Sequence, residues 1–175
     1  IEYVSVTADY LQGSAVFANQ ASAYISLVGS LSIDQDIALT NGWNIISFNV
    51  TPDDMDMSNI LSGLIDENSL VKVQSETGAA MEYVSFLQTW TNNIGNMANT
   101  EGYYVKVNQA TTVSTSGSLV NVPLDISLSN GWNIISYPTG NGQDALAALD
   151  ALIAEGSLVK VQSETGAAIE YISFF

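Results

Sequence analysis

The twelve residues SLVKVQSETGAA occur twice in this chain without a difference, at residues 69–80 and at residues 157–168. In each copy, valines alternate with a lysine and a glutamine, which predicts a β-strand, and the ETG triplet that follows predicts a turn. A second strand comes after each copy, as MEYVSF from Met81 and as IEYISF from Ile169. The stretch is therefore expected to form an antiparallel hairpin. A third version of the second strand, IEYVSV, opens the chain at Ile1.

The hairpin belongs to a longer internal repeat. The string NGWNIIS begins at Asn41 and again at Asn130, an interval of 89 residues, whereas the two hairpin copies lie 88 residues apart. Self-similarity at a fixed interval marks a chain of repeated units. We interpret residues 36–124 as one complete module, residues 125–175 as the front half of a second module, and residues 1–35 as the back half of another.

Each module is expected to be rich in β-structure, with one short helix. NGWNIIS predicts a buried strand at residues 43–48, with Trp43 and its counterpart Trp132 in the core. A further strand is expected at residues 103–107. The sequence therefore predicts a β-rich α+β fold of antiparallel sheet or sandwich modules with a two-fold internal repeat.

The expected helix is clearest in the second copy, where leucines recur at helical spacing over residues 143–154 and Gly156 provides the C-cap. In the first copy, Asp56 or Ser58 is the expected N-cap, because short oxygen-bearing side chains accept a bond from the first free N–H groups of a helix.

The composition excludes several kinds of function. The 18 acidic residues stand against three lysines and give a formal net charge of −15, which would repel nucleic acid and anionic membranes. The chain has no cysteine and no histidine, so disulfides, thiolate metal sites and the usual general base are absent. No apolar run reaches the length of a membrane helix, and the first residue is not methionine, consistent with a removed signal peptide or a fragment. We expect an extracellular or cell-surface protein without membrane insertion.

The order of the motifs resembles a tandem repeat module of secreted and cell-surface bacterial proteins. The resemblance rests on GWNIIS, an acidic turn, a hairpin, NNIGN at residues 92–96 and EGYYVKV at residues 101–107. It covers most of the middle module, and each outer piece matches as half of a module. It implies an extracellular, non-catalytic module that is commonly arranged in tandem.

Two further motifs have a functional and a simpler interpretation. Asp53, Asp54 and Asp56 could bind Ca²⁺ through hard oxygen ligands, or could form the acidic first turn of a helix, which the helix dipole favours. No cofactor is required otherwise. Trp90, in a polar loop, could stack on a sugar ring or cap the core.

The lysines are the only other candidates for chemistry. SxxK at Ser69–Lys72 and at Ser157–Lys160 matches a penicillin-binding motif, but it is placed on a strand, where residues three apart face opposite sides. Lysines on strands also permit an intramolecular isopeptide bond, although nothing in the sequence requires one. No acid–base pair is visible that the repeat would not duplicate, so we expect no enzyme activity.

The incomplete outer modules suggest assembly. A front half without its back half leaves open strand edges and an uncovered apolar face. Either residues 1–35 complete residues 125–175 of the same chain, or they complete a neighbouring copy and so build a head-to-tail filament or surface layer. The two ends repeat the same strand, which favours the second arrangement, and Phe17 replaces a lysine of the middle module. The expected assembly residues are Ile1, Glu2, Tyr3, Val4, Ser5, Phe17, Ile169, Tyr171, Ile172 and Phe174. The alternative is an adhesin or carbohydrate-binding module that uses Trp90.

Overall fold

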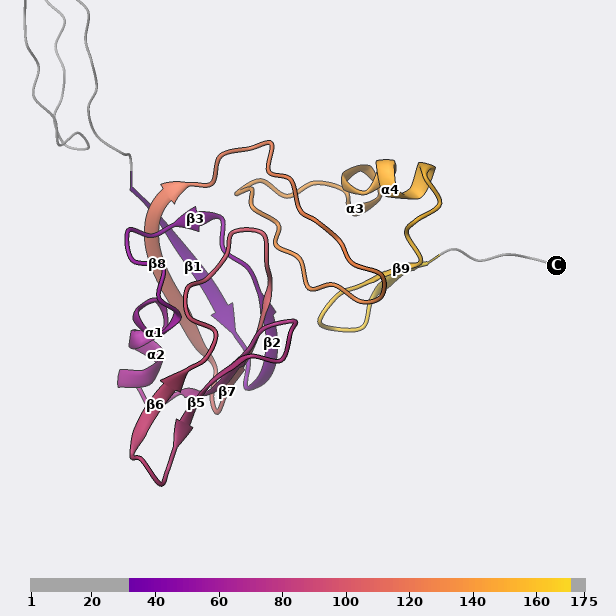
Figure 1. The fold of residues 1–175 in the computed structure, drawn as a ribbon. Helices are drawn as coiled ribbons and strands as arrows, with labels where there is room; N and C mark the ends of the chain where they lie inside the picture. The colour runs from indigo at the N-terminus through magenta and orange to yellow at the C-terminus, as the bar shows by residue number, and fades with distance from the viewer. Residues whose placement is uncertain (1–31, 171–175) are drawn as a thin grey trace, which may run out of the picture.

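The computed structural model describes residues 32–170, and these residues form antiparallel β-sheets with a few short helices (Figure 1). The predicted β-rich fold is confirmed at this level. Most of the expected assembly residues lie outside the described residues, namely Ile1, Glu2, Tyr3, Val4, Ser5, Phe17, Tyr171, Ile172 and Phe174.

A three-stranded sheet has the order β1-β8-β3, with β1 at Ile33–Leu39, β8 at Thr111–Leu119 and β3 at Val50–Thr51. Strand β1 pairs with β8 along its full length, from Ile33 opposite Gly117 to Leu39 opposite Thr111. Gly117 is required by the close approach of β3, because a Cβ atom there would lie 2.3 Å from the carbonyl oxygen of Thr51. The expected module boundary at residue 36 falls within β1.

A five-stranded sheet has the order β2-β7-β4-β5-β6. Its strands are β2 (Gly42–Ile46), β7 (Tyr103–Val107), β4 (Leu70–Gln74), β5 (Ala80–Val84) and β6 (Thr89–Asn92). Along β7 the odd-numbered side chains are buried and the even-numbered ones are not, as expected of a strand with one face on the core. The strand predicted at residues 103–107 is thus confirmed.

Two short helices, α1 (Met57–Ile60) and α2 (Ser62–Asp66), complete this part of the chain. They bury Met57, Ile60 and Leu64, and Leu61 between them is also fully buried. A single helix was predicted here. The structure instead has two, because Leu61 has φ −101° and ψ 12°, which interrupts the helical backbone. Both sheets and both helices share one hydrophobic core.

The second copy of the repeat forms shorter elements. Helices α3 (Ala145–Ala148) and α4 (Asp150–Ala154) are followed by the hairpin β9 (Lys160–Gln162) and β10 (Ala168–Glu170). These elements lie to one side of the first copy in Figure 1. Neither helix contains a buried residue, whereas both helices of the first copy do.

The prediction that Trp43 and Trp132 lie in the core is wrong. Their side chains are 45% and 67% exposed. In β2 the alternation of faces decides this, because Asn44 and Ile46 point inward and Trp43 must then point outward. Trp90 lies in strand β6, not in a loop, and is paired with Tyr83 of β5.

Candidate assembly site

The repeated hairpin occurs in two different environments. In the first copy, β4 is an interior strand, paired with β5 on one side and with β7 on the other. In the second copy, β9 pairs with β10 alone within the described part of the chain. The edge of β9 that corresponds to the β4–β7 pairing is therefore open among these residues.

The two hairpins have the same local geometry. Gly78 and Gly166 each have φ +87°. The hydroxyl oxygens of Ser75 and Thr77 are 3.0 Å apart, as are those of Ser163 and Thr165. The local sequence thus determines the turn in both copies, and what differs between them is the strand that lies beside each hairpin.

The side chains that β7 and the core cover in the first copy are uncovered in the second. Val73 and Ser69 are fully buried, but their counterparts Val161 and Ser157 are half-buried and exposed. Leu146, Ile153 and Val159 are large apolar residues with 52%, 45% and 82% exposure. An apolar surface of this kind marks a contact site in many soluble proteins. We refer to the open edge of β9 together with the exposed side chains of α3 and α4 as the open face.

The expected assembly residue Ile169 lies in β10, on the paired side of β9 and not at its open edge. It is half-buried in β10, opposite Val161 of β9. Next to it, the carboxylate of Glu170 forms an ion pair with Lys160 at 3.5 Å, as Glu82 does with Lys72 at 2.9 Å in the first copy.

The acidic cluster is held by protein donors. Asp56 is the N-cap of α1, which was one of the two alternatives predicted from the sequence. Its Oδ1 accepts hydrogen bonds from the backbone N–H of Ser58 at 2.8 Å and from Nδ2 of Asn92 at 3.2 Å. The bond from the Ser58 backbone lowers the pKa of Asp56. Asp54 accepts from the Asp56 N–H at 2.9 Å and from Nδ2 of Asn59 at 2.7 Å.

Asp53 and Asp54 border a hollow of about 440 Å³, and most of the other residues that line it are serines and a threonine, the majority of them in β8. Among residues 32–170, no group of three or more acidic side chains has the geometry of a metal site. The calcium site remains a prediction from the sequence.

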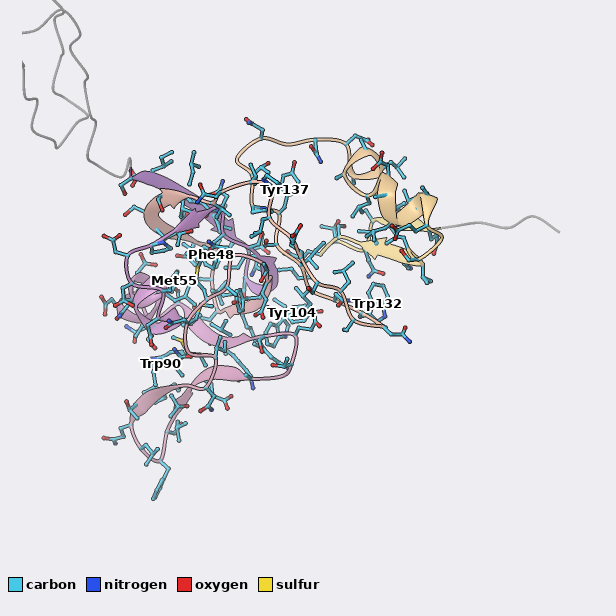
Figure 2. All side chains as sticks on the ribbon, turned by 45° about the horizontal axis from the view of Figure 1, so that its top comes forward. Phe48, Met55, Trp90, Tyr104, Trp132 and Tyr137 are labelled. Atoms are coloured by element: carbon cyan, nitrogen blue, oxygen red, sulfur yellow. The ribbon has the colours of Figure 1, made fainter. Side chains whose placement is uncertain are left out.

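Trp90 packs partly against the core, with its ring edge-on to Tyr83 at a centroid distance of 6.0 Å. Figure 2 shows it near the base of the β5–β6 hairpin, which projects from the rest of the fold in Figure 1. The turn of this hairpin carries Phe86, which is 93% exposed, and Leu87. From Tyr83 to Asn92 the hairpin has no charged residue. Phe86 was not among the residues predicted to be functional, although Phe86 and Leu87 form an apolar pair in a short turn.

The outer face of the five-stranded sheet holds a second aromatic group that the sequence analysis missed. Trp43 and Tyr104 meet edge-on, with centroids 6.2 Å apart, and Nζ of Lys106 lies 5.6 Å from the centre of the Trp43 ring. Strict alternation along residues 103–107 places Tyr104 and Lys106 on one face of β7, and the β2–β7 register, which the sequence did not predict, sets Trp43 opposite Lys106.

The two SxxK serines differ in exposure, because Ser157 of the second copy is exposed and Ser69 of the first is not. Ser69 is fully buried and its hydroxyl donates to the carbonyl oxygen of Leu64 at 3.1 Å. Lys72 is engaged with Glu82.

Comparisons of the chain with protein-family models, with curated proteins and with solved structures gave no match. In the described range, residues 32–170, none of the helices has the length and apolar character needed to cross a bilayer.

Proposed function

We propose that this chain is a non-catalytic, extracellular or cell-surface structural protein that assembles head-to-tail by strand complementation into a filament or surface layer. Its units are sandwich modules that repeat at 88–89 residues. The back half-module of one copy, predicted at residues 1–35, completes the open face of the next.

The observation that carries this proposal is the contrast between the two hairpins. Ser69 and Val73 are fully buried in the copy where β7 lies beside the hairpin, and their counterparts Ser157 and Val161 are exposed and half-buried where it does not. Leaving a strand edge and several large apolar side chains in water is unfavourable and promotes association. A partner that supplies a β7-like strand would cover both.

The N-terminal part of the sequence contains a segment that aligns with β7. Gly13 aligns with Gly102 at the 89-residue interval, which sets residues 14–18 on β7 and Phe17 on Lys106. In the first copy Lys106 is directly opposite Trp43 in the β2–β7 register. A strand of residues 14–18 in the same register would place Phe17 against Trp132. This pairing gives a reason for an aromatic residue where the middle module has a lysine.

The chain contains one strand segment more than two modules need, and this surplus favours completion by a neighbouring copy over completion within the same chain. Residues 1–5 and residues 169–173 repeat the same segment and would occupy the same position in one module. A joint between two copies can use the surplus as an added edge strand. Divalent cations would then reduce the repulsion between chains that each carry a net charge of −15.

Negative-stain electron microscopy tests the proposal, with calcium and with chelator. We expect fibres from the full chain, monomers after deletion of residues 1–5 and in Phe17→Ala, and unchanged fibres in the matched control Phe86→Ala. Loss of fibres in chelator would assign a role to divalent cations. Uniform monomers of the unaltered chain in both conditions would refute assembly.

The projecting β5–β6 hairpin favours a second candidate, an adhesin or carbohydrate-binding module. Its exposed Phe86 and the Tyr83–Trp90 pair offer an uncharged aromatic surface to a glycan or an apolar partner. This candidate predicts that Trp90→Ala abolishes binding in a glycan screen and that deletion of residues 1–5 has no effect on it.

A further inference from the structure

Two carboxylates connect the first and second copies of the repeat in a reciprocal manner. Oε2 of Glu164, in the second copy, accepts a hydrogen bond from the backbone N–H of Ile45 at 2.7 Å. Oε2 of Glu76, in the first copy, accepts one from the N–H of Ile134 at 2.5 Å. The two glutamates hold the same position in SETGAA, and the two isoleucines hold the same position in NGWNIIS. Each copy therefore gives one donor and one acceptor to the other.

The acceptor side of this contact is preorganised by the hairpin turn. In the first copy the N–H of Ser75 donates to the carbonyl oxygen of Ala79 at 2.9 Å, and in the second the N–H of Ser163 donates to that of Ala167 at 2.8 Å. Both turns are closed by a glycine at positive φ. The carboxylate thus projects from a turn of fixed shape.

The donor side is preorganised as well. Oδ1 of Asn44 accepts from the N–H of Thr40, and Oδ1 of Asn133 accepts from the N–H of Ser129, both at 2.8 Å. Each asparagine also donates back to the same residue's carbonyl oxygen, at 2.9 and 3.0 Å. Asn44 is buried and Asn133 is not, yet the loops around the two asparagines have the same hydrogen bonds. The NGWN sequence itself therefore determines the shape of the loop.

Backbone contacts accompany the reciprocal pair. The N–H of Gly102 donates to the carbonyl oxygen of Ile134 at 2.9 Å, and the N–H of Ser136 donates to that of Thr100 at 3.2 Å. Gly102 makes this approach possible, because a Cβ atom there would lie 2.8 Å from Cγ2 of Ile134 and 3.1 Å from the carbonyl oxygen of Ile135.

From this geometry we propose that the NGWNII loop and the ETG turn together form a self-complementary docking element, whose partner is a second copy of the same element. In this chain the partner is supplied by the other half of the repeat. A contact in which the same surface is used on both sides closes on itself and does not propagate. Each isoleucine N–H is one donor and is already bonded, so neither element can accept a third copy.

The docking element also protects an edge of the sheet. Strand β2 is the outermost strand of the five-stranded sheet on its side, and Ile45 lies within it. A free edge N–H would be available for unwanted strand pairing, and a charged side chain bound there blocks it. If the chain assembles as proposed above, the docking element also determines where a fibre grows. The two repeat copies of one chain form a closed pair, and further copies add only at the open face. The repeating block of a fibre is then one chain of two copies.

Hydrogen–deuterium exchange at micromolar concentration tests the docking element. The informative peptic peptides contain Ile45 and Ile134 and are distinguished by Phe48 and Tyr137 at their ends. In both Glu76→Ala and Glu164→Ala we expect both isoleucine amides to exchange about tenfold faster, because the loss of one charge-assisted bond opens the closed pair. Glu155→Ala, which removes an exposed carboxylate from the end of α4, is the matched control and should leave both peptides unchanged.

Acceleration of only the directly bonded amide, or of neither, would overturn the reciprocal pairing. The axial repeat of fibres is the second measurement. A repeat of one chain supports the closed pair, and a repeat of one 88–89-residue module contradicts it. If the unaltered chain forms no fibres, the proposed assembly fails, whereas the exchange result, obtained on monomers, still decides the docking element.

Discussion

Val73 and Val161 occupy the same position in two identical twelve-residue strings, so replacing each with alanine compares two environments without a change of local sequence. Val73 is fully buried between β5 and β7, and Val161 is half-buried in a strand with one open edge. The pair of variants measures what the neighbouring strand contributes.

The expected magnitudes follow from burial. Val→Ala removes two methyl groups, worth about 0.8 kcal/mol each when fully buried, and the cavity left in a packed core adds to the loss. Val73→Ala should therefore lower the free energy of unfolding by about 2 kcal/mol. Val161→Ala should lower it by less than about 1 kcal/mol in monomers, because much of its surface is already in water.

Urea unfolding of monomers, followed by circular dichroism, measures both values. Val71→Ala and Val159→Ala are the controls in the same strings, since both side chains are exposed, and neither should change stability by more than about 0.5 kcal/mol. If a complementing strand covers Val161 in the fibre, Val161→Ala should raise the concentration needed for fibre growth about tenfold, the equivalent of 1.4 kcal/mol. Equal losses for Val73→Ala and Val161→Ala in monomers would refute the reasoning, because the second copy would then need no completion.

Three further predictions concern individual side chains. Asp56→Ala should lower the free energy of unfolding by about 1 kcal/mol, because α1 loses its N-cap. Since the pKa of Asp56 is lowered in the folded protein, this stabilisation is present above the unfolded pKa of 3.8 and is lost as the pH falls through the folded pKa. Asp56→Asn should retain the cap and show no such pH dependence in acid titrations. Burial raises the pKa of Tyr103 to about 12, so the stability contributed by its neutral hydroxyl is complete below the ordinary pKa of 10.0 and is lost as the pH rises through 12. Ultraviolet titration should show one tyrosine that ionises near pH 12, and Tyr103→Phe should remove this transition. Gly102→Ala should cost about 1–3 kcal/mol in urea unfolding by overpacking against Ile134, whereas Gly63→Ala, with open space around it, should be neutral or stabilising.

Local sequence was sufficient where the structure depends on a few neighbouring residues. The hairpin turns, the Asp56 N-cap and the strand at Tyr103–Val107 could all be predicted. The placement of the tryptophans could not be predicted from composition, because an aromatic residue is apolar enough for a core yet Trp43 lies on the outer side of β2. The break at Leu61 recurs at the equivalent Leu149 between two helices that bury no residue, so tertiary packing does not explain it. The reciprocal glutamate bonds join residues far apart in the sequence, which no short window of sequence contains.

The two copies of SLVKVQSETGAA separate local from non-local causes within one chain. Their turns have the same φ at glycine and the same serine–threonine contact, so these features belong to the twelve residues. Strand length is not determined by the twelve residues alone, because β4 has five residues and β9 has three. The difference arises from β7, which pairs with β4 and has no equivalent beside β9 among residues 32–170. A strand supplied to β9 should therefore extend it to the length of β4, which makes the protection of the Leu158 and Val159 amides against exchange a direct measure of complementation.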